Sequence, residues 1–269
     1  MKQSKSGTPT GQEKGQPNES GESPGVRSVQ RAIDILALLT ETQPSVSVTD
    51  IVKATGLAKT TVIRLVHTLE QNGLLWATSK GYVAGPGLWR WAHLARTSWE
   101  LPAEAQQLMR DLADRQGETV NLYVLRDTSR VCVAQQESRQ PLRHVVRVGD
   151  ELPLWGGASA KVLLHNAAPA LLLRVAEDAP EGSGDVEALE SEVAATAERG
   201  YAVSHGEREA GLTAVAVPVA GRSGAVVAAL TLSGPSVRFP ADRIDEFVAD
   251  LEDTASHMAQ RGLDSPFTL

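Results

Sequence analysis

The sequence has a single cysteine, Cys132, few aromatic residues and no long apolar run. One cysteine excludes an internal disulfide and a cysteine-rich zinc site. No apolar run approaches the roughly 20 residues that cross a bilayer, and no apolar segment follows the N-terminal lysines. We therefore expect a cytoplasmic protein without a membrane partner, and the residues suggest neither a metal nor a cofactor.

Positive charge is also scarce, since the formal net charge of the 269 residues is −7. The charge is unevenly distributed. Residues 26–97 contain eight lysines and arginines against four acidic residues, a net charge of +4, and residues 1–25 are neutral. Residues 98–269 therefore carry −11. Opposite signs favour two parts with different partners, and only the basic part gains from releasing the counterions of DNA.

The order of elements in residues 26–85 is typical of a winged helix-turn-helix. A disordered tail is expected at 1–25, where large apolar residues are almost absent. Helices are then predicted over 28–41, 47–55 and 58–71, with Ser28 as one N-cap and with Ser47 and Asp50 resembling a capping box. Gly56 suits the turn between the second and third helices. Two β segments, 74–77 and 82–84, flank a polar turn and form the wing.

The third helix opens with Lys59, Thr60 and Thr61, and Arg64 follows on its outer side. The first residues of a recognition helix reach base edges, and arginine is the residue that most often binds guanine. A single basic helix would more often only be solvated, but the preceding helix, the glycine turn and the wing favour DNA binding. The residues expected to contact DNA are Arg27, Arg31, Ser47, Lys59, Thr60, Thr61, Arg64 and Lys80.

The segments SVQRAIDILALL, SVTDIVKATGLAKTTVIRLVHTLEQNGLL and GYVAGPGLW resemble the DNA-binding domain of the IclR family of bacterial regulators. Beyond them GETVNLYVL, ASAKVLL, ERGYAVSHGEREAGLTAVAVPV and LTLSGP are similar to that family in order and spacing. The resemblance implies a transcriptional regulator, more often a repressor than an activator. It also implies a homodimer or dimer of dimers on operator DNA, with a GAF-like effector-binding domain at 101–262.

A linker helix is predicted at 86–100, where the chain reads GPGLWRWAHLARTSWE. Apolar residues lie on nearly every side of this helix, and Trp89, Trp91 and Trp99 are three of the five tryptophans of the chain. Such a helix is not suited to contact with water. It forms either a dimer seam that sets the spacing of two DNA-binding heads, which we favour, or a contact with its own effector domain.

The residues of 101–262 predict an α+β domain, within the broader α/β class, with a mixed or antiparallel sheet. Helices are expected over 102–116, 159–165, 186–199 and 240–261. Strands are expected over 119–125, 131–136, 143–148, 201–204, 214–219 and 226–232. The last residues, 263–269, are expected to form a tail.

The segment LWGGASAK is the strongest candidate for an effector pocket. Its two glycines allow a tight turn before a helix whose first amides favour an anion, and Trp155 would supply an apolar wall. The family resemblance implies effector contacts at Ala158, Ser159, Ser204, Ala214, Thr231 and Ser233. Leu142, His144 and Val146 align more loosely with the family's apolar wall, and His144 and His205 are more simply interpreted as surface or hydrogen-bonded histidines.

Two positions depart from members of the family that bind small acids. Ser204 and Ala214 stand where Asp and Cys are common, which predicts a roomier pocket and a larger or aromatic acid as the effector. The alternatives are a DNA-binding regulator without a ligand and an enzyme fused to a DNA-binding domain. The enzyme has little support, because no catalytic motif occurs, Cys132 lies in an apolar strand, and Glu207-Arg208-Glu209 reads as a solvated turn.

Overall fold

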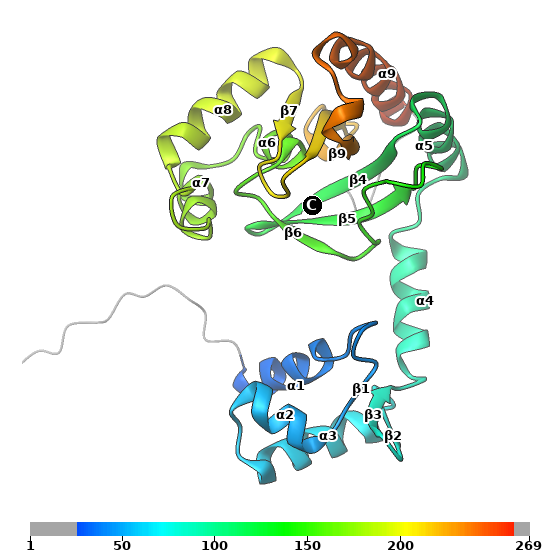
Figure 1. Cartoon of the computed structure of the whole chain (residues 1–269), viewed down its shortest axis with the longest axis vertical. Coiled ribbons are helices and arrows are strands. Elements are labelled where there is room, and N and C mark those ends of the chain that lie inside the picture. The colour runs from blue at the N-terminus through cyan, green and yellow to red at the C-terminus, as the bar shows by residue number, and fades with distance from the viewer. Residues whose placement is uncertain (1–25, 261–269) are drawn as a thin grey trace, which may run out of the picture. The chain divides into compact units, whose positions relative to one another are not determined.

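A computed structural model describes residues 26–260 of the chain, which form two compact units divided between Leu94 and Ala95. The expected tails at 1–25 and 263–269 lie outside the described residues. Figure 1 labels the elements of both units. None of the helices within 26–260 is both long and apolar enough to cross a membrane.

The N-terminal unit contains the helix-turn-helix and wing that the sequence predicts. Its helices are α1 (Arg27–Ala37), α2 (Val48–Thr55) and α3 (Lys59–Gln71). Strands β1 (Ser45–Val46), β2 (Leu75–Thr78) and β3 (Gly81–Ala84) form an antiparallel sheet in the order β1-β3-β2, in which β1 was not predicted. Ile35, Val46, Ile51, Val62, Val66, Leu69 and Leu75 make up its buried core.

The capping box of α2 is confirmed. The Ser47 hydroxyl accepts a hydrogen bond from the Asp50 amide at 3.2 Å, and the Asp50 carboxylate accepts one from the Ser47 amide at 2.9 Å. The Ser47 hydroxyl also donates to the Asp50 carboxylate at 2.7 Å, and this bond, together with the one from the Ser47 amide, lowers the pKa of Asp50. Gly56 ends the helix in the left-handed conformation that glycine adopts at no steric cost.

The prediction for α1 is wrong in two respects. Ser28 lies within the helix rather than at its N-cap, which is Val26, and the helix ends at Ala37 rather than Glu41. The predicted apolar stripe is also only partly buried: Val29 and Ile33 remain about half exposed, and Ile35 is the buried residue. The other predicted residues, Ala32, Leu36 and Leu39, do pack against the core, so the packed face is shifted toward Ile35 and away from Val29 and Ile33.

Helix α4 (Leu88–Ser98) follows the wing and contains the division between the two units. None of its residues is buried, and Trp89 is 80% exposed.

The C-terminal unit has the α+β fold that the sequence predicts. Its six-stranded sheet is antiparallel throughout, in the order β6-β5-β4-β9-β8-β7. The strands are β4 (Thr119–Arg126), β5 (Ser129–Gln136), β6 (Glu151–Pro153), β7 (Ala202–His205), β8 (Leu212–Ala220) and β9 (Val226–Pro235). The helices are α5 (Ala103–Gln116), α6 (Ala158–Leu163), α7 (Pro169–Glu177), α8 (Val186–Arg199) and α9 (Ala241–Gln260).

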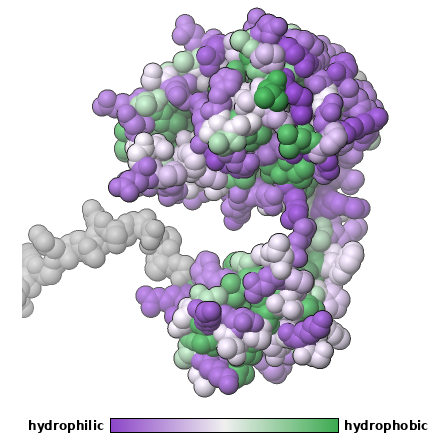
Figure 2. Space-filling view, viewed as in Figure 1, coloured by the Kyte–Doolittle hydropathy of each residue, from purple (hydrophilic) through white to green (hydrophobic). Residues whose placement is uncertain are grey.

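The two faces of this sheet differ in side-chain size. Large residues of alternate positions, among them Leu122, Val217 and Leu230, pack against α5 and α9, which lie side by side in Figure 1. The opposite face presents smaller residues, among them Ala216 and Ala229, to α6 and its neighbours. Polar residues cover most of the outer surface that Figure 2 shows. The alternation therefore places large side chains toward α5 and α9 and smaller ones toward α6.

The predicted strand at 143–148 is wrong. This segment is an irregular loop, and β5 pairs instead with β6, which was not predicted. His144 lines the cavity and Val146 is buried, while Val145 between them is exposed. That alternation mimics a strand although the segment has no ladder of hydrogen bonds. Helix α7, with Pro169 at its first turn, was also missed.

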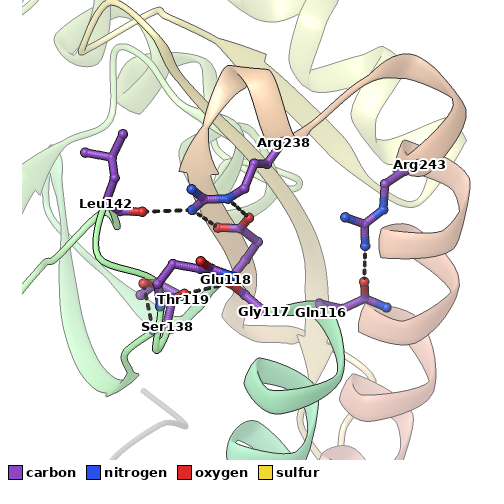
Figure 3. A network of polar contacts seen from close by, with 9 residues as sticks. Gln116, Gly117, Glu118, Thr119, Ser138, Leu142, Arg238 and Arg243 are labelled. Atoms are coloured by element: carbon purple, nitrogen blue, oxygen red, sulfur yellow. Dashed lines mark hydrogen bonds and ion pairs between the residues drawn. The ribbon is translucent and has the colours of Figure 1, made fainter.

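A buried ion pair anchors the loop that leads to His144 (Figure 3). Arg238, in the 3-10 turn Ser236–Arg238, donates to both carboxylate oxygens of Glu118 and to the Leu142 carbonyl, the last at 3.0 Å. The Ser138 hydroxyl donates to the Gly117 carbonyl at 2.6 Å. Glu118 is 1% exposed, so Arg238 is the cation that compensates its charge.

We predict that Arg238→Met destabilises the protein more than Glu118→Gln. Loss of the arginine leaves a carboxylate buried without a counterion, which typically costs about 3–5 kcal/mol. Loss of the carboxylate charge leaves an arginine that reaches solvent, and the cost is about 1–3 kcal/mol. Urea unfolding of both variants tests the order, and a smaller loss for Arg238→Met contradicts it.

Candidate functional site

The α6 face of the sheet contains a small cavity of about 30 Å³. Strand β9 contributes Thr231 and Ser233, whose neighbours Leu230 and Leu232 point to the opposite face. The turn before α6 contributes Gly157, with Ala158 and Ser159 at the start of the helix. This volume holds one or two water molecules, whereas sites for organic ligands are about 300–1,000 Å³. The roomier pocket expected from Ser204 and Ala214 is therefore not present in this conformation.

The structure brings seven of the ten predicted effector residues to this cavity. They are His144, Ala158, Ser159, Ser204, Ala214, Thr231 and Ser233. The other three do not line it: Leu142 is two-thirds exposed, Val146 is buried in the core beneath α6, and Trp155 packs against that same core. The aromatic residue of the cavity wall is instead Tyr123, which the sequence analysis did not identify.

Arg130, on β5, is a buried cation of the cavity and was not predicted. The residue is 3% exposed, and Nη1 donates to the carbonyls of Pro153 and Gly156, the latter at 3.0 Å. The guanidinium also lies 5.7 Å from the centre of the Tyr123 ring. Burial lowers the pKa of Arg130 to about 10, so the group remains charged near neutral pH.

Two polar atoms in the wall of the cavity have no partner among residues 26–260. They are Nε of Arg130 and the hydroxyl of Thr231, and each belongs to a residue less than 4% exposed. A buried polar group without a hydrogen bond costs about 1–3 kcal/mol. A carboxylate could accept a hydrogen bond from either of these groups.

His144 closes another side of the cavity. Its Nδ1 lies 3.0 Å from the Ser233 hydroxyl, which accepts a hydrogen bond from the Asn121 amide at 3.3 Å. The serine hydrogen is then available to the imidazole, an arrangement that suits a neutral ring. Burial lowers the pKa of His144, and the positive charges of Arg208 and Arg130 act in the same direction.

The run Glu207-Arg208-Glu209 lies in a turn with Glu207 and Glu209 exposed, as the sequence suggested, but it also contributes to the cavity. All three residues line the cavity, and they belong to the turn 206–211 between β7 and β8. One Glu207 oxygen accepts a hydrogen bond from the Gly157 amide at 2.7 Å, and the other accepts one from Lys161 Nζ at 2.6 Å. No local pattern indicates these bonds, because they join residues about fifty positions apart.

Cys132 lies in the core beside the cavity rather than in its wall. Burial raises the pKa of its thiol to about 12, so the sulfur stays protonated near neutral pH.

The predicted DNA contacts lie on the N-terminal unit. Lys59, Thr60 and Arg64 are exposed on α3, and Lys80 is exposed at the turn of the wing. None of these three cations forms an ion pair within the described part of the chain. Arg27 and Arg31 are exposed on α1, whereas Ser47 uses its hydroxyl and amide to cap α2. Unpaired cations at the start of an exposed helix are suited to a phosphate backbone.

Two family models match the chain. The IclR helix-turn-helix domain matches residues 28–76, and the C-terminal domain of the bacterial transcriptional regulator IclR matches residues 93–260. The chain belongs to the IclR family. The resemblance seen in the sequence and the α+β fold are thereby confirmed, and the two units correspond to a DNA-binding domain and an effector domain.

Relatives across the IclR family align with nearly the whole chain. The HTH-type transcriptional regulators XynR and KdgR of Escherichia coli K12 are 32% and 31% identical, over 89% and 90% of this chain and 96% and 95% of their own lengths. A Rhodococcus protein described as an IclR-family transcriptional regulator has a crystal structure with 41% identity. The superposition of the two has a TM-score of 0.60 and covers 93% of this chain and 98% of the Rhodococcus chain. An IclR homologue from Microbacterium hydrocarbonoxydans, solved with 4-hydroxybenzoate, shares the fold at 24% identity and a TM-score of 0.71, over 87% and 98% of the two chains.

His144 makes the stability of this IclR-family protein depend on pH. Its pKa is lower in the folded chain than the usual 6.5, so the unfolded chain takes up a proton first as the pH falls. We predict that stability decreases between pH 7.5 and 5.5 and that His144→Asn makes this decrease smaller. Urea unfolding at several pH values measures both slopes, and identical slopes in the two proteins would show that His144 does not contribute.

Proposed function

We propose that this chain represses transcription in the cytoplasm by binding operator DNA as a dimer or a dimer of dimers, and that a small organic acid releases it. The observation that carries the proposal is the pairing of a basic, exposed recognition helix with a cavity that contains a buried and only partly bonded arginine. A relative 28% identical to this chain, AllR of Escherichia coli K12, is named a transcriptional repressor.

The recognition helix supports the DNA-binding half of this proposal. Lys59 lies at its first position and Arg64 about one turn later, both exposed. A lysine at this end of the helix is suited to phosphate, while the longer, planar arginine is suited to a guanine edge.

Helix α4 supports the dimer. Trp89, Trp91 and Leu94 are 80%, 57% and 47% exposed, and no residue of the helix is buried by the chain's own described residues. Apolar surface of this kind is costly in water and marks an interface with another molecule. A second copy of the same helix is the simplest partner, since a two-fold dimer matches a two-fold operator.

The cavity supports an acidic effector. Arg130 supplies a buried positive charge, Thr231 a free hydroxyl and Tyr123 an aromatic wall. This chemistry favours a carboxylate on an aromatic or compact organic body. The Microbacterium hydrocarbonoxydans homologue, whose title names 4-hydroxybenzoate, makes that acid a reasonable first probe.

Substitutions on the recognition helix separate affinity from specificity. Lys59→Ala is expected to weaken binding to every DNA sequence. It is also expected to reduce the slope of the logarithm of the binding constant against the logarithm of the salt concentration by about one. Arg64→Ala is expected to relax base preference at one position, at a cost of about 1–3 kcal/mol. Gel shifts with the DNA upstream of the chain's own gene test both, with Arg110→Ala on α5 as a charge-matched control. Unchanged operator affinity in both variants contradicts the assignment.

Thr231→Val separates ligand binding from folding. The hydroxyl has no partner, so the isosteric valine is expected to raise the stability of the ligand-free protein by about 1 kcal/mol. The same change is expected to weaken binding of an acid such as 4-hydroxybenzoate about fivefold to tenfold. Calorimetric titration and thermal unfolding measure the two effects. A variant that loses stability, or that binds the acid as tightly as the wild type, contradicts this role.

The double variant Trp89→Ser/Trp91→Ser tests the dimer seam. Removal of both side chains is expected to produce monomers at micromolar concentration in sedimentation experiments, because large aromatic anchors dominate interfaces. Trp76→Ser is the matched control, since Trp76 is 56% exposed on the wing. If the dimer of the double variant has the same dissociation constant as the wild type, the dimer interface does not lie on α4.

A further inference from the structure

The carboxylate of Glu207 already binds at the edge of the cavity where we place the effector acid. Its Oε2 accepts a hydrogen bond from the Gly157 amide, and its Oε1 from Lys161 Nζ, at 2.7 and 2.6 Å. Gly157 precedes α6 and itself lines the cavity. The protein thus presents one of its own carboxylates to a polar group of the pocket.

Arg130 is close to the same place. A Cβ on Gly157 would lie 2.8 Å from Nη2 of Arg130, so the guanidinium is packed directly against the glycine whose amide Glu207 binds. The Nε of Arg130 and the Thr231 hydroxyl remain without partners in the cavity wall, and the cavity holds only about 30 Å³. An organic acid therefore cannot enter until neighbouring side chains move.

The surroundings of Glu207 favour its departure from this position. Its side chain is 30% exposed, and its turn begins and ends near Gly206 and Gly211, which both have the positive φ values natural to glycine. Lys161, which is 10% exposed, keeps a second partner when Glu207 leaves, because Glu192 lies 2.6 Å from the same Nζ. A second carboxylate beside Glu207 would also repel it.

We propose that Glu207 is an internal substitute for the carboxylate of the effector, which an incoming acid must displace from Gly157 together with the turn 206–211. The inference rests on the proposed acid-sensing function and adds a switch to it. In the ligand-free chain Glu207 binds the turn 206–211 to the start of α6. In the acid-bound chain that bond is broken, and the freed turn between β7 and β8 is the part of the domain that changes. Competition of this kind multiplies the intrinsic affinity for every acid by the fraction of time that Glu207 is not bound to Gly157.

The test is the affinity of Glu207→Gln and Glu207→Ala for 4-hydroxybenzoate and pyruvate, measured by calorimetric titration of the full chain. Both variants are expected to bind the acids about tenfold more tightly than the wild type, since the competing charge is gone. Neutral 4-hydroxybenzamide is expected to gain nothing. Glu192→Gln is the matched control, because it removes the other carboxylate from Lys161 without touching Gly157, and it should leave acid affinity unchanged.

Hydrogen exchange without ligand gives a second readout. Two peptides, one containing Gly157 and one containing the turn 206–211, are expected to exchange faster in Glu207→Ala than in the wild type or Glu192→Gln. Adding an acid that binds should speed exchange of the turn in the wild type. Thermal unfolding confirms that each variant is folded before it is compared.

The outcomes separate this inference from the proposal on which it rests. If both Glu207 variants bind the acids no more tightly than the wild type, Glu207 is not a substitute for the effector carboxylate, and acid sensing itself is unaffected. Failure of the wild type and every variant to bind either acid overturns acid sensing and the substitute role together. Tighter binding of the acids alone supports both.

Discussion

The charge of Arg130 is the constraint around which the effector domain is organised. Transfer of a guanidinium from water to a protein interior costs several kcal/mol unless other groups compensate it. Two backbone carbonyls and the face of Tyr123 compensate part of that cost, and Nε remains without a partner. A side chain that keeps its charge yet lacks one hydrogen bond is suited to receive an anion, and this is the physical basis of the sensor that we propose.

Other parts of the effector domain shape the surroundings of the Arg130 guanidinium. Alternation along the strands places large residues against α5 and α9 and small ones toward α6, so the space around Arg130 is not filled by the core. The ion pair of Glu118 and Arg238 fixes the loop that leads to His144. In the N-terminal unit, by contrast, Lys59, Arg64 and Lys80 are exposed and form no ion pair within residues 26–260. Cations of this kind are suited to a phosphate backbone. Under the proposed function, the ligand need only favour one arrangement of two heads over another.

Local patterns predicted most of the secondary structure and all of the helix-turn-helix. Ser47, Asp50 and Gly56 define α2 by interactions within a few residues of one another, and such short-range chemistry is legible in a sequence. Errors arose where a segment with the pattern of a strand formed no ladder of hydrogen bonds, as in residues 143–148, and where only part of an expected apolar stripe was packed, as in α1. Neither outcome can be read from spacing alone, because each depends on a segment distant in the chain.

The residues of the cavity also divide into those that the sequence indicates and those that only the fold brings together. The resemblance to known regulators indicated Thr231 and Ser233, but Arg130 was missed because the predicted strand began at residue 131, two residues after the start of β5. A strand that includes Arg130 places it on the same face as Cys132, and a charge at that position is a visible signal. Glu207 offered no such signal, since its bonds to Gly157 and Lys161 exist only after β7, β8 and α6 have come together.

The most direct test of this account is the side-chain NMR signal of Arg130 in protein labelled with nitrogen-15 arginine and assigned with Arg130→Lys. An acid that binds is expected to shift the Nε resonance of Arg130 strongly, because Nε gains its missing hydrogen-bond acceptor. The neutral amide of the same acid should leave it in place. An acid that binds the protein tightly while the Arg130 signal does not move would contradict the account.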